Sequence, residues 1–242
     1  MSFIRKLILS SILFACIHSA QAGLVILGTR FIYPAEQKSI QVHLRNEGAF
    51  PSLAQSWIDD GQADSNNNQL NNLRHIPFVI TPPVSRINPQ TEQTLRIRYT
   101  GQELPQDRES IFYLNIKDIP AKPKVDDNLN NYLQFTFTSR LKLFFRPTKL
   151  PYPVEEAYAK VSWHAEGKRI RAKNNTPYYI TYASVSIKQQ DKQHFSEQTA
   201  MIAPFSEHSF TLPVNVSGSN QVYWRIINDY GGHYESVSPL QP

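Results

Sequence analysis

The clearest pattern in the chain is an alternation of apolar and polar residues that recurs in short runs. Every second residue is apolar in Ile40–Leu44, Leu95–Tyr99, Phe112–Ile116 and Leu133–Thr138. A period of two places the apolar side chains of a strand on one face. Turn-forming clusters of Asn, Asp, Gly and Pro separate the runs, and no long segment keeps the 3.6-residue period of an amphipathic helix. The sequence therefore predicts an all-β fold of the sandwich type.

A cluster of prolines divides these runs into two groups. Pro147, Pro151 and Pro153 interrupt the segment from Arg146 to Pro153, where a regular strand cannot continue. Strand patterns resume beyond it, in Val161–Trp163, Tyr178–Ile187, Ser209–Leu212 and Val222–Ile227. We expect an N-terminal domain over residues 23–147 and a C-terminal one over residues 148–242, joined at an angle that leaves a cleft. The polar stretches Asp60–Asn72 and Pro120–Asn131 are expected to be loops.

The first 22 residues have the layout of a secretory signal peptide. Arg5 and Lys6 form a positive start, an apolar run follows from Leu7 to Ile17, and Ala20-Gln21-Ala22 is a small-x-small cleavage pattern. The apolar run is too short to span a bilayer, and no later segment is long and apolar enough. We expect an exported chain that is cleaved after Ala22 and is not embedded in a membrane.

Charge and cysteine content exclude several classes of protein. Without the signal peptide the chain has 23 basic and 20 acidic residues, a net charge of +3 that is scattered along the sequence. This does not suit a nucleic-acid-binding protein. Cys16, the only cysteine, lies in the signal peptide, so the mature chain has no disulfide, thiol nucleophile or cysteine metal site. We expect no metal and no cofactor.

Motifs of common enzymes are missing from the sequence. It contains no G-x-S-x-G, no H-E-x-x-H and no Gly-rich phosphate loop, so we expect no catalytic residues and no enzyme. Two rivals stay open: a hydrolase whose site assembles from distant residues, and a two-domain β-sandwich adhesin or carbohydrate-binding protein. The second would use Trp57, Trp163 or Trp224 as a sugar platform, although Trp57 and Trp163 lie within strand patterns, which favours the core.

The segment Asn131–Pro147 allows two interpretations. Its apolar residues Leu133, Phe135 and Phe137 share one face of a predicted strand. Periodicity alone favours an ordinary strand whose apolar face joins the core. The other interpretation is an edge strand whose backbone and apolar side chains are available to a partner chain.

Ordered motifs run along nearly the whole mature chain. They are Gly28–Pro34, Leu53–Ile58, Thr81–Arg86, Lys142–Pro147, Asn175–Tyr179, Ile227–Gly232 and, as the most specific, Leu104–Ser110 followed by Phe112–Ile116 and Ile119-Pro120. In this order they resemble the motifs of the periplasmic chaperones of the chaperone–usher pathway, which assemble pili on Gram-negative bacteria.

The resemblance implies two immunoglobulin-like domains arranged as a boomerang, and a function without ATP or cofactor. It implies that the chain binds pilin or fimbrial subunits that lack their last strand, lends them its own strand, and delivers them to the outer-membrane usher. The absence of cysteines and the modest loop before the lent strand resemble the short-loop class of the family. A free chaperone with such an open strand is also expected to self-associate.

Specific residues take roles by the same resemblance. Leu133, Phe135 and Phe137 would fill the groove of the subunit as the donor strand. Arg30 and Lys142 match the basic pair that anchors the C-terminal carboxylate of the subunit. An interdomain salt bridge is implied for Glu109, Arg146 and Asp229.

Overall fold

The computed structural model describes residues 23–61, 76–121, 133–217 and 221–242, and most of them lie in β-strands. Within these ranges one short α-helix, α2 (Val154–Ala157), runs into a 3-10 turn over Tyr158–Lys160. The predicted all-β fold is confirmed. The predicted signal peptide and most of the two predicted polar loops lie outside the described residues.

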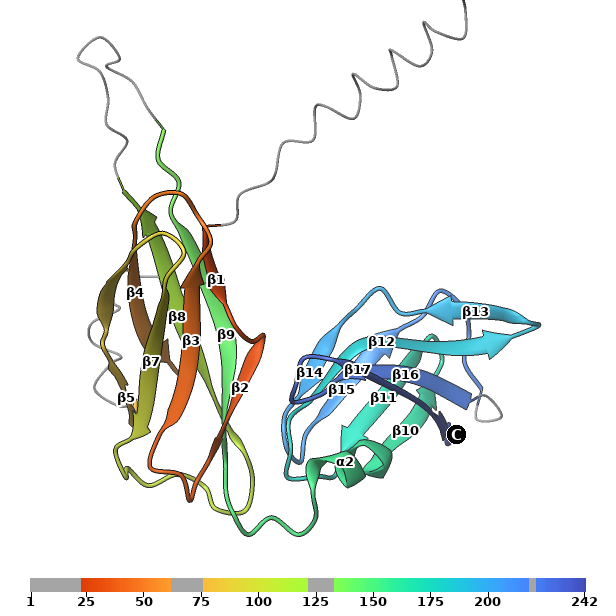
Figure 1. The fold of residues 1–242 in the computed structure, drawn as a ribbon. Coiled ribbons are helices and arrows are strands. Elements are labelled where there is room, and N and C mark those ends of the chain that lie inside the picture. Colours follow the sequence, from red (N-terminus) through yellow and green to blue (C-terminus); the bar gives the residue numbers. More distant parts are fainter. Residues whose placement is uncertain (1–22, 62–75, 122–132, 218–220) are drawn as a thin grey trace, which may run out of the picture.

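The N-terminal domain is a sandwich of two sheets (Figure 1). The first has the order β1-β3-β7-β5, with the bounds Leu24–Ile26, Ile40–Asn46, Glu92–Tyr99 and Phe78–Thr81. The second has the order β2-β9-β8-β4-β6, with the bounds Arg30–Pro34, Phe137–Arg146, Ser110–Pro120, Ser52–Asp59 and Val84–Ile87. All neighbouring strands are antiparallel except β2 and β9, which are parallel.

Aromatic rings fill the end of this sandwich at which β9 runs into the proline-rich segment that follows it. Tyr33, Phe78, Tyr99 and Phe145 contact one another, and their ring centroids are 4.7–6.4 Å apart. The buried Tyr33 hydroxyl donates to the Gln37 carbonyl at 2.9 Å and accepts from the Tyr99 amide at 3.0 Å. The rings therefore join both sheets without leaving the phenol unpaired.

The C-terminal domain is a second sandwich with its own core. One sheet has the order β10-β11-β15, with the bounds Val161–Glu166, Arg169–Asn174 and Glu207–Thr211. The other has the order β13-β12-β16-β17, with β14 also paired to β12. The bounds of these strands are Lys192–Phe195, Ile180–Gln189, Gln221–Ile227, His233–Pro239 and Ala200–Ile202. Trp163, Tyr182, Phe210 and Trp224 form its aromatic centre.

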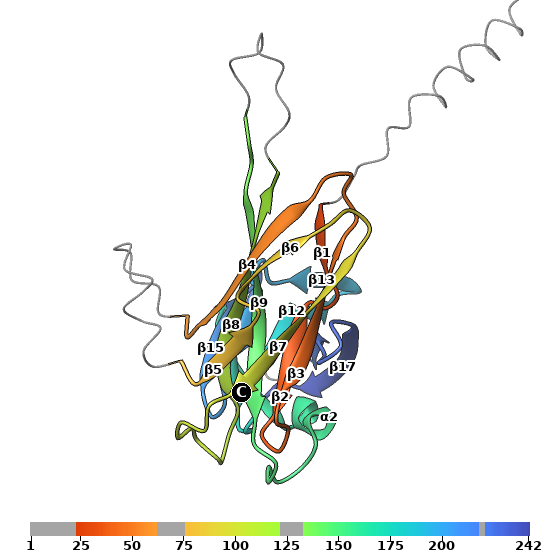
Figure 2. The same ribbon diagram turned by 60° about the vertical axis from the view of Figure 1, so that its left-hand side comes forward.

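Strands β8 and β9 extend beyond the rest of the N-terminal domain (Figure 2). Their ladder reaches from Ser110 opposite Phe145 to Asp118 opposite Phe137. The sequence pattern predicts a strand that already includes Leu133, and this is wrong for residues 133–136, because β9 begins only at Phe137. The ladder with β8 ends there, and β8 itself ends at Pro120.

The buried side chain of Asn174 holds backbone groups of two loops in the second domain. Its amide donates to the carbonyls of Tyr178 at 2.8 Å and Ala203 at 2.9 Å, and its side-chain oxygen accepts from the Thr176 amide at 3.1 Å. We expect Asn174→Ala to lower the free energy of unfolding by about 3 kcal/mol, because buried backbone groups lose their partners. Urea denaturation measures the change.

Asn175→Ala is the matched control, because Asn175 is exposed and makes only a surface contact, to Ser162 at 3.2 Å. We expect a change within about 0.5 kcal/mol for this variant. Equal losses in the two variants would contradict the role given to Asn174.

Candidate functional site

One side of β9 is open along half of its length. Strand β8 pairs with β9 from Phe137 to Phe145, whereas β2 on the other side pairs only with Lys142–Arg146. Among the strands that the structure describes, none occupies the second side between Phe137 and Leu141. The backbone there presents unpaired hydrogen-bonding groups to a further strand.

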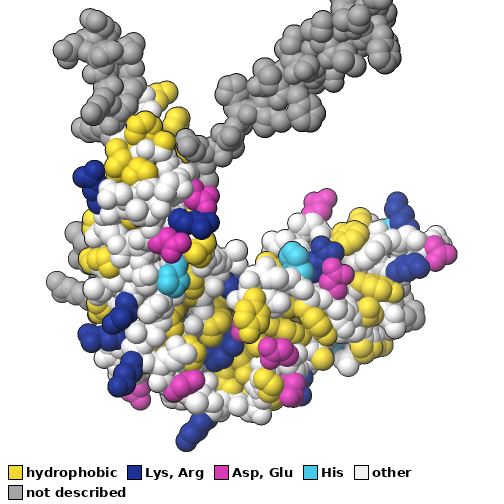
Figure 3. All heavy atoms as spheres, in the orientation of Figure 1, with side chains coloured by type: hydrophobic (Ala, Val, Ile, Leu, Met, Phe, Trp, Pro, Cys, Tyr) yellow, Lys and Arg dark blue, Asp and Glu magenta, His cyan; other side chains and the backbone are white. Residues whose placement is uncertain are grey.

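Of the three apolar residues singled out from the sequence, Phe137 begins this open edge, and Leu133 and Phe135 lie in the segment just before it. Leu133, Phe135 and Phe137 are 88%, 67% and 68% exposed. The interpretation that places them in the domain core is therefore wrong. Further along the same face of β9, Leu143 and Phe145 are buried in the domain core. Hydrophobic side chains gather at the end of the domain from which β8 and β9 extend (Figure 3).

Arg30 and Lys142 lie at the other end of the open edge, where β2 begins to pair with β9. They are direct neighbours in the parallel ladder, and both are partly buried. Arg30 Nη1 donates to the Ile227 carbonyl at 2.9 Å, and Lys142 Nζ lies 3.3 Å from the Thr181 hydroxyl. Because Thr181 and Ile227 belong to the second domain, the two cations lie where the domains meet.

The surroundings of this basic pair favour an added anion. Burial lowers the pKa of Arg30, although the Asp229 carboxylate opposes the change. Burial also lowers the pKa of Lys142, and the neighbouring charge of Arg30 lowers it further. Arg30 Nε is buried and lacks an acceptor among the described residues, within which neither cation forms an ion pair. A carboxylate here would relieve the repulsion through charge-assisted hydrogen bonds.

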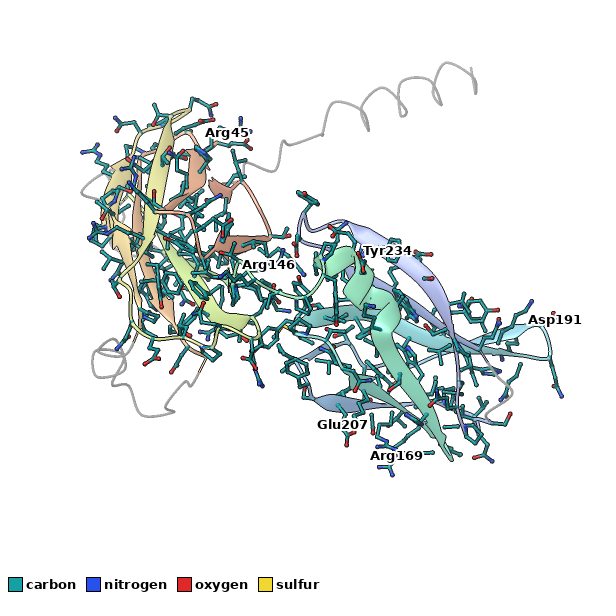
Figure 4. All side chains as sticks on the ribbon, turned by 90° about the horizontal axis from the view of Figure 1, so that it is seen from below. Arg45, Arg146, Arg169, Asp191, Glu207 and Tyr234 are labelled. Atoms are coloured by element: carbon teal, nitrogen blue, oxygen red, sulfur yellow. The ribbon has the colours of Figure 1, made fainter. Side chains whose placement is uncertain are left out.

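Glu109, Arg146 and Asp229 form one network between the domains. Arg146 Nε donates to Glu109 Oε1 at 2.7 Å, and its Nη1 and Nη2 atoms donate to the two oxygens of Asp229 at 2.6 and 3.1 Å. Glu109 Oε2 accepts from the Tyr179 amide at 2.8 Å. Figure 4 shows Arg146 at the junction between the two domains.

Burial has a large effect on this network. It raises the pKa of the Glu109 carboxyl, and attraction to Arg146 opposes the rise. Burial by itself would lower the pKa of Arg146, but its hydrogen bonds to Asp229 and its attraction to Glu109 raise the pKa on balance. The arginine therefore stays charged and links one acid from each domain.

Two further side-chain contacts join the domains. The Arg108 guanidinium lies 4.8 Å from the centroid of the Phe205 ring, and the rings of Phe144 and Tyr179 lie 5.7 Å apart. Phe205 adopts a positive φ of 56°, which is uncommon for a bulky side chain. Arg108 belongs to the motif Leu104–Ser110, but nothing in the sequence near Phe205 marks it as its partner.

The structure also places the residues that the two rival classes of protein, a carbohydrate-binding protein and a hydrolase, would use. Trp163 and Trp224 are buried in the second core, so neither is available as a sugar platform, whereas Trp57 is partly exposed. In the described parts of the chain, no group of three or more His, Cys, Asp or Glu side chains is arranged to hold a metal ion. No helix in the same residues is long and apolar enough to cross a membrane.

Two family models together match most of the chain. Residues 23–151 match the pili and flagellar-assembly chaperone, PapD N-terminal domain, and residues 156–237 match the pili assembly chaperone PapD, C-terminal domain. The chaperone protein HifB of Haemophilus influenzae is 41% identical over 229 residues, which cover 93% of this chain and 91% of HifB.

Solved structures agree with the family models. The YadV chaperone of Escherichia coli matches with a TM-score of 0.76 and 36% identity, over 90% of this chain and 100% of that one. The SafB chaperone of Salmonella enterica, solved in complex with SafA pilin, matches with a TM-score of 0.74 and 25% identity, over 92% and 99% of the two chains. The protein therefore has two immunoglobulin-like domains and belongs to the PapD-like chaperones that assemble pili and fimbriae through the chaperone–usher pathway.

Proposed function

We propose that this chain is a periplasmic chaperone that binds pilin subunits by donor-strand complementation and delivers them to the outer-membrane usher. The observation that carries the proposal is the open edge of β9, with exposed apolar residues at its start and the basic pair at its end. The similar chaperone SafB, solved with a pilin, supports the kind of partner. Cleavage after Ala22 would release the chain into the periplasm.

The apolar residues of the donor segment define what the partner must lack. A sandwich without its last strand exposes a groove of core side chains and a row of unpaired backbone groups. Leu133, Phe135 and Phe137 fill the groove, and the backbone of β9 pairs with the groove edge. Burial of three such side chains gives roughly 5–9 kcal/mol, part of which the ordering and docking of the segment offsets.

The basic pair determines how far the subunit strand extends along β9. Arg30 and Lys142 lie where β2 takes over the second side of β9, so an added strand has to end there. A strand that ends with its C-terminal carboxylate at this point brings an anion to two partly buried cations. The register of the added strand is therefore set by charge, while the alternate side chains supply the contact area.

The network around Arg146 keeps the cleft between the domains in one shape. It holds the second domain beside the basic pair, so Ile227 and Thr181 can orient Arg30 and Lys142 before the subunit arrives. A site organised in advance loses less free energy when the subunit binds. No step of this scheme requires ATP, because folding of the subunit is completed only when strands are exchanged at the usher.

Replacement of both anchor residues tests the proposed binding site. We expect Arg30→Ala with Lys142→Ala to weaken the one-to-one complex with a cognate pilin by about 100-fold or more, because two charge-assisted contacts are lost. Co-expression in the periplasm followed by purification of the complex measures this, and circular dichroism checks the fold. Lys173→Ala, an exposed change on β11, is the control. A folded native chain that binds no pilin, but does bind a glycan, would favour the adhesin.

Replacement of donor side chains tests the apolar contribution separately. Phe135→Ser and Phe137→Ser are each expected to weaken pilin binding by about 30-fold, since each removes about 2 kcal/mol of burial. The urea midpoint of the free chaperone should not change, because both rings are exposed in it. Phe195→Ser is the matched control, as Phe195 is 52% exposed in the second domain. Equal effects of all three substitutions would contradict the donor role.

Loss of Arg146 tests the interdomain network. Arg146→Met would leave the buried Glu109 carboxylate without its cation, and we expect a loss of about 3–5 kcal/mol in the free energy of unfolding. Small-angle X-ray scattering should show a wider range of interdomain angles. Arg171→Met, which breaks partly exposed pairs with Glu166 and Glu207 inside the second domain, should cost less than about 1 kcal/mol. An unchanged scattering curve for Arg146→Met would contradict the role of the network.

A further inference from the structure

The first two strands that the structure describes belong to two different sheets. Strand β1 pairs with β3, whereas β2 pairs with β9 (Figure 1). The chain changes sheets at Gly28, whose φ of 139° favours glycine, and a Cβ atom at this position would lie 3.0 Å from the Phe31 ring. Because β2 runs parallel to β9 with Arg30 opposite Lys142, a straight extension of β2 would lie opposite residues 137–141. Residues 25–29 are thus an internal competitor for the open edge.

A carboxylate lies beside the start of β1. Asp118 Oδ2 accepts a hydrogen bond from the Leu24 amide at 3.3 Å, and its Oδ1 accepts one from the Ser52 hydroxyl. The side chain is partly buried, and it forms no ion pair with a residue in the described ranges. Such a carboxylate has hydrogen-bond donors but lacks the cation that would stabilise its charge.

The α-nitrogen of Gly23 is within reach of this carboxylate. The Gly23 carbonyl accepts from the Glu47 amide at 3.0 Å, which places Gly23 in the ladder with the end of β3. A Cβ atom at Gly23 would lie 3.0 Å from Asp118 Oδ2. The α-nitrogen is bonded to the same Cα and lies about 2.5 Å from that Cβ position. A positive charge on this nitrogen therefore lies no more than about 5.5 Å from Asp118 Oδ2.

Cleavage after Ala22 is what would create this charge. In the uncleaved chain the Gly23 nitrogen is a neutral peptide group, while in the mature chain it is an ammonium near neutral pH. Glu47 is also close to Gly23, because its backbone amide donates to the Gly23 carbonyl. Its carboxylate, however, already pairs with Arg45 at 2.6 Å. Asp118 is thus the carboxylate that remains available to the new terminus.

We infer that Asp118 is the binding site for the mature N-terminal ammonium of Gly23, and that this ion pair fastens β1 to β3. The inference rests on the cleavage site of the proposed function. A fastened β1 stays in the sheet opposite β9, so residues 25–29 do not cover the edge that receives the subunit. Removal of the signal peptide then completes the sheet at the same step that releases the chain.

A double-mutant cycle on the free mature protein tests the ion pair. The four proteins are the mature chain, Asp118→Asn, the mature chain extended by Ala22, and the combination of both changes. The measurement is amide hydrogen exchange of Glu47, whose N–H donates to Gly23. Each single change is expected to speed exchange by about fivefold, as suits a partly exposed ion pair, and the combination should exchange no faster than the Asp118→Asn protein.

The cycle separates the ion pair from the other contacts of Asp118. Asp118→Asn also alters the hydrogen bonds from Ser52 and Leu24, but that loss is the same whether or not Gly23 is charged. If the two increases in exchange rate multiply in the combined protein, the inference is overturned. That result would show that Asp118 stabilises this region independently of the charge on Gly23. Unchanged exchange in the chain extended by Ala22 would overturn it too, even if Asp118→Asn does not fold.

Two controls keep the result specific. Asp191→Asn removes an almost fully exposed carboxylate at the tip of a hairpin in the second domain and should leave Glu47 exchange unchanged (Figure 4). Exchange of the Asn174 amide, which donates to Ser206 in that domain, should be equal in all four proteins. No subunit is present in these measurements, so failure of pilin binding and failure of the ion pair are observed independently.

Discussion

Strand β9 has two neighbours over its second half and one neighbour over its first half, and the other features of the site depend on this asymmetry. Full pairing with β8 and β2 anchors the C-terminal half in the core of the domain. The first half keeps its hydrogen-bonding groups available while β8 holds it in strand geometry. A free peptide with the same residues would have to be ordered on binding, which costs about 1–2 kcal/mol per residue. Pairing on one side supplies most of that order in advance.

An open, apolar edge is a liability for a soluble protein, because it can pair with any exposed strand. Here the edge is limited at both ends. The end near Phe137 extends beyond the sandwich, and the other end meets two partly buried cations. A strand without a terminal anion leaves Arg30 and Lys142 repelling each other in a place where water screens them weakly. In the proposed function, charge thus restricts which strands bind well to an edge that backbone pairing alone would leave unselective.

The interdomain network shows the same use of buried charge. A buried ion pair contributes little net stability compared with apolar packing, but removal of one partner is costly. Arg146 joins Glu109 of the first domain to Asp229 of the second. Few positions of the second domain allow its guanidinium to bond to both acids at once. This favours one interdomain arrangement over others. Arg108 on Phe205 and Phe144 near Tyr179 add contacts that allow little sliding.

The sequence alone determined the all-β fold, since a period of two identifies a strand and shows which residues share its apolar face. Its motifs also pointed to the family and to the eight residues with proposed roles. It did not determine whether Leu133, Phe135 and Phe137 are buried. Their alternation is the same as that of a core strand, but these side chains are exposed. Whether an apolar face is covered depends on which strands lie opposite, and that is a property of the assembled sheets.

The family resemblance implied a salt bridge of Arg146 with Asp229, but the sequence did not give its geometry. The contact of Arg108 with Phe205 and the approach of Gly23 to Asp118 were decided only by the tertiary structure. These partners are far apart in the chain, and nothing in local spacing relates them. Their contacts arise because two sandwiches pack at one angle and because the chain changes sheets at Gly28. Local pattern sets the strands through hydrogen bonding and burial between near neighbours, while long-range pairing of charges follows from how the finished sheets are placed.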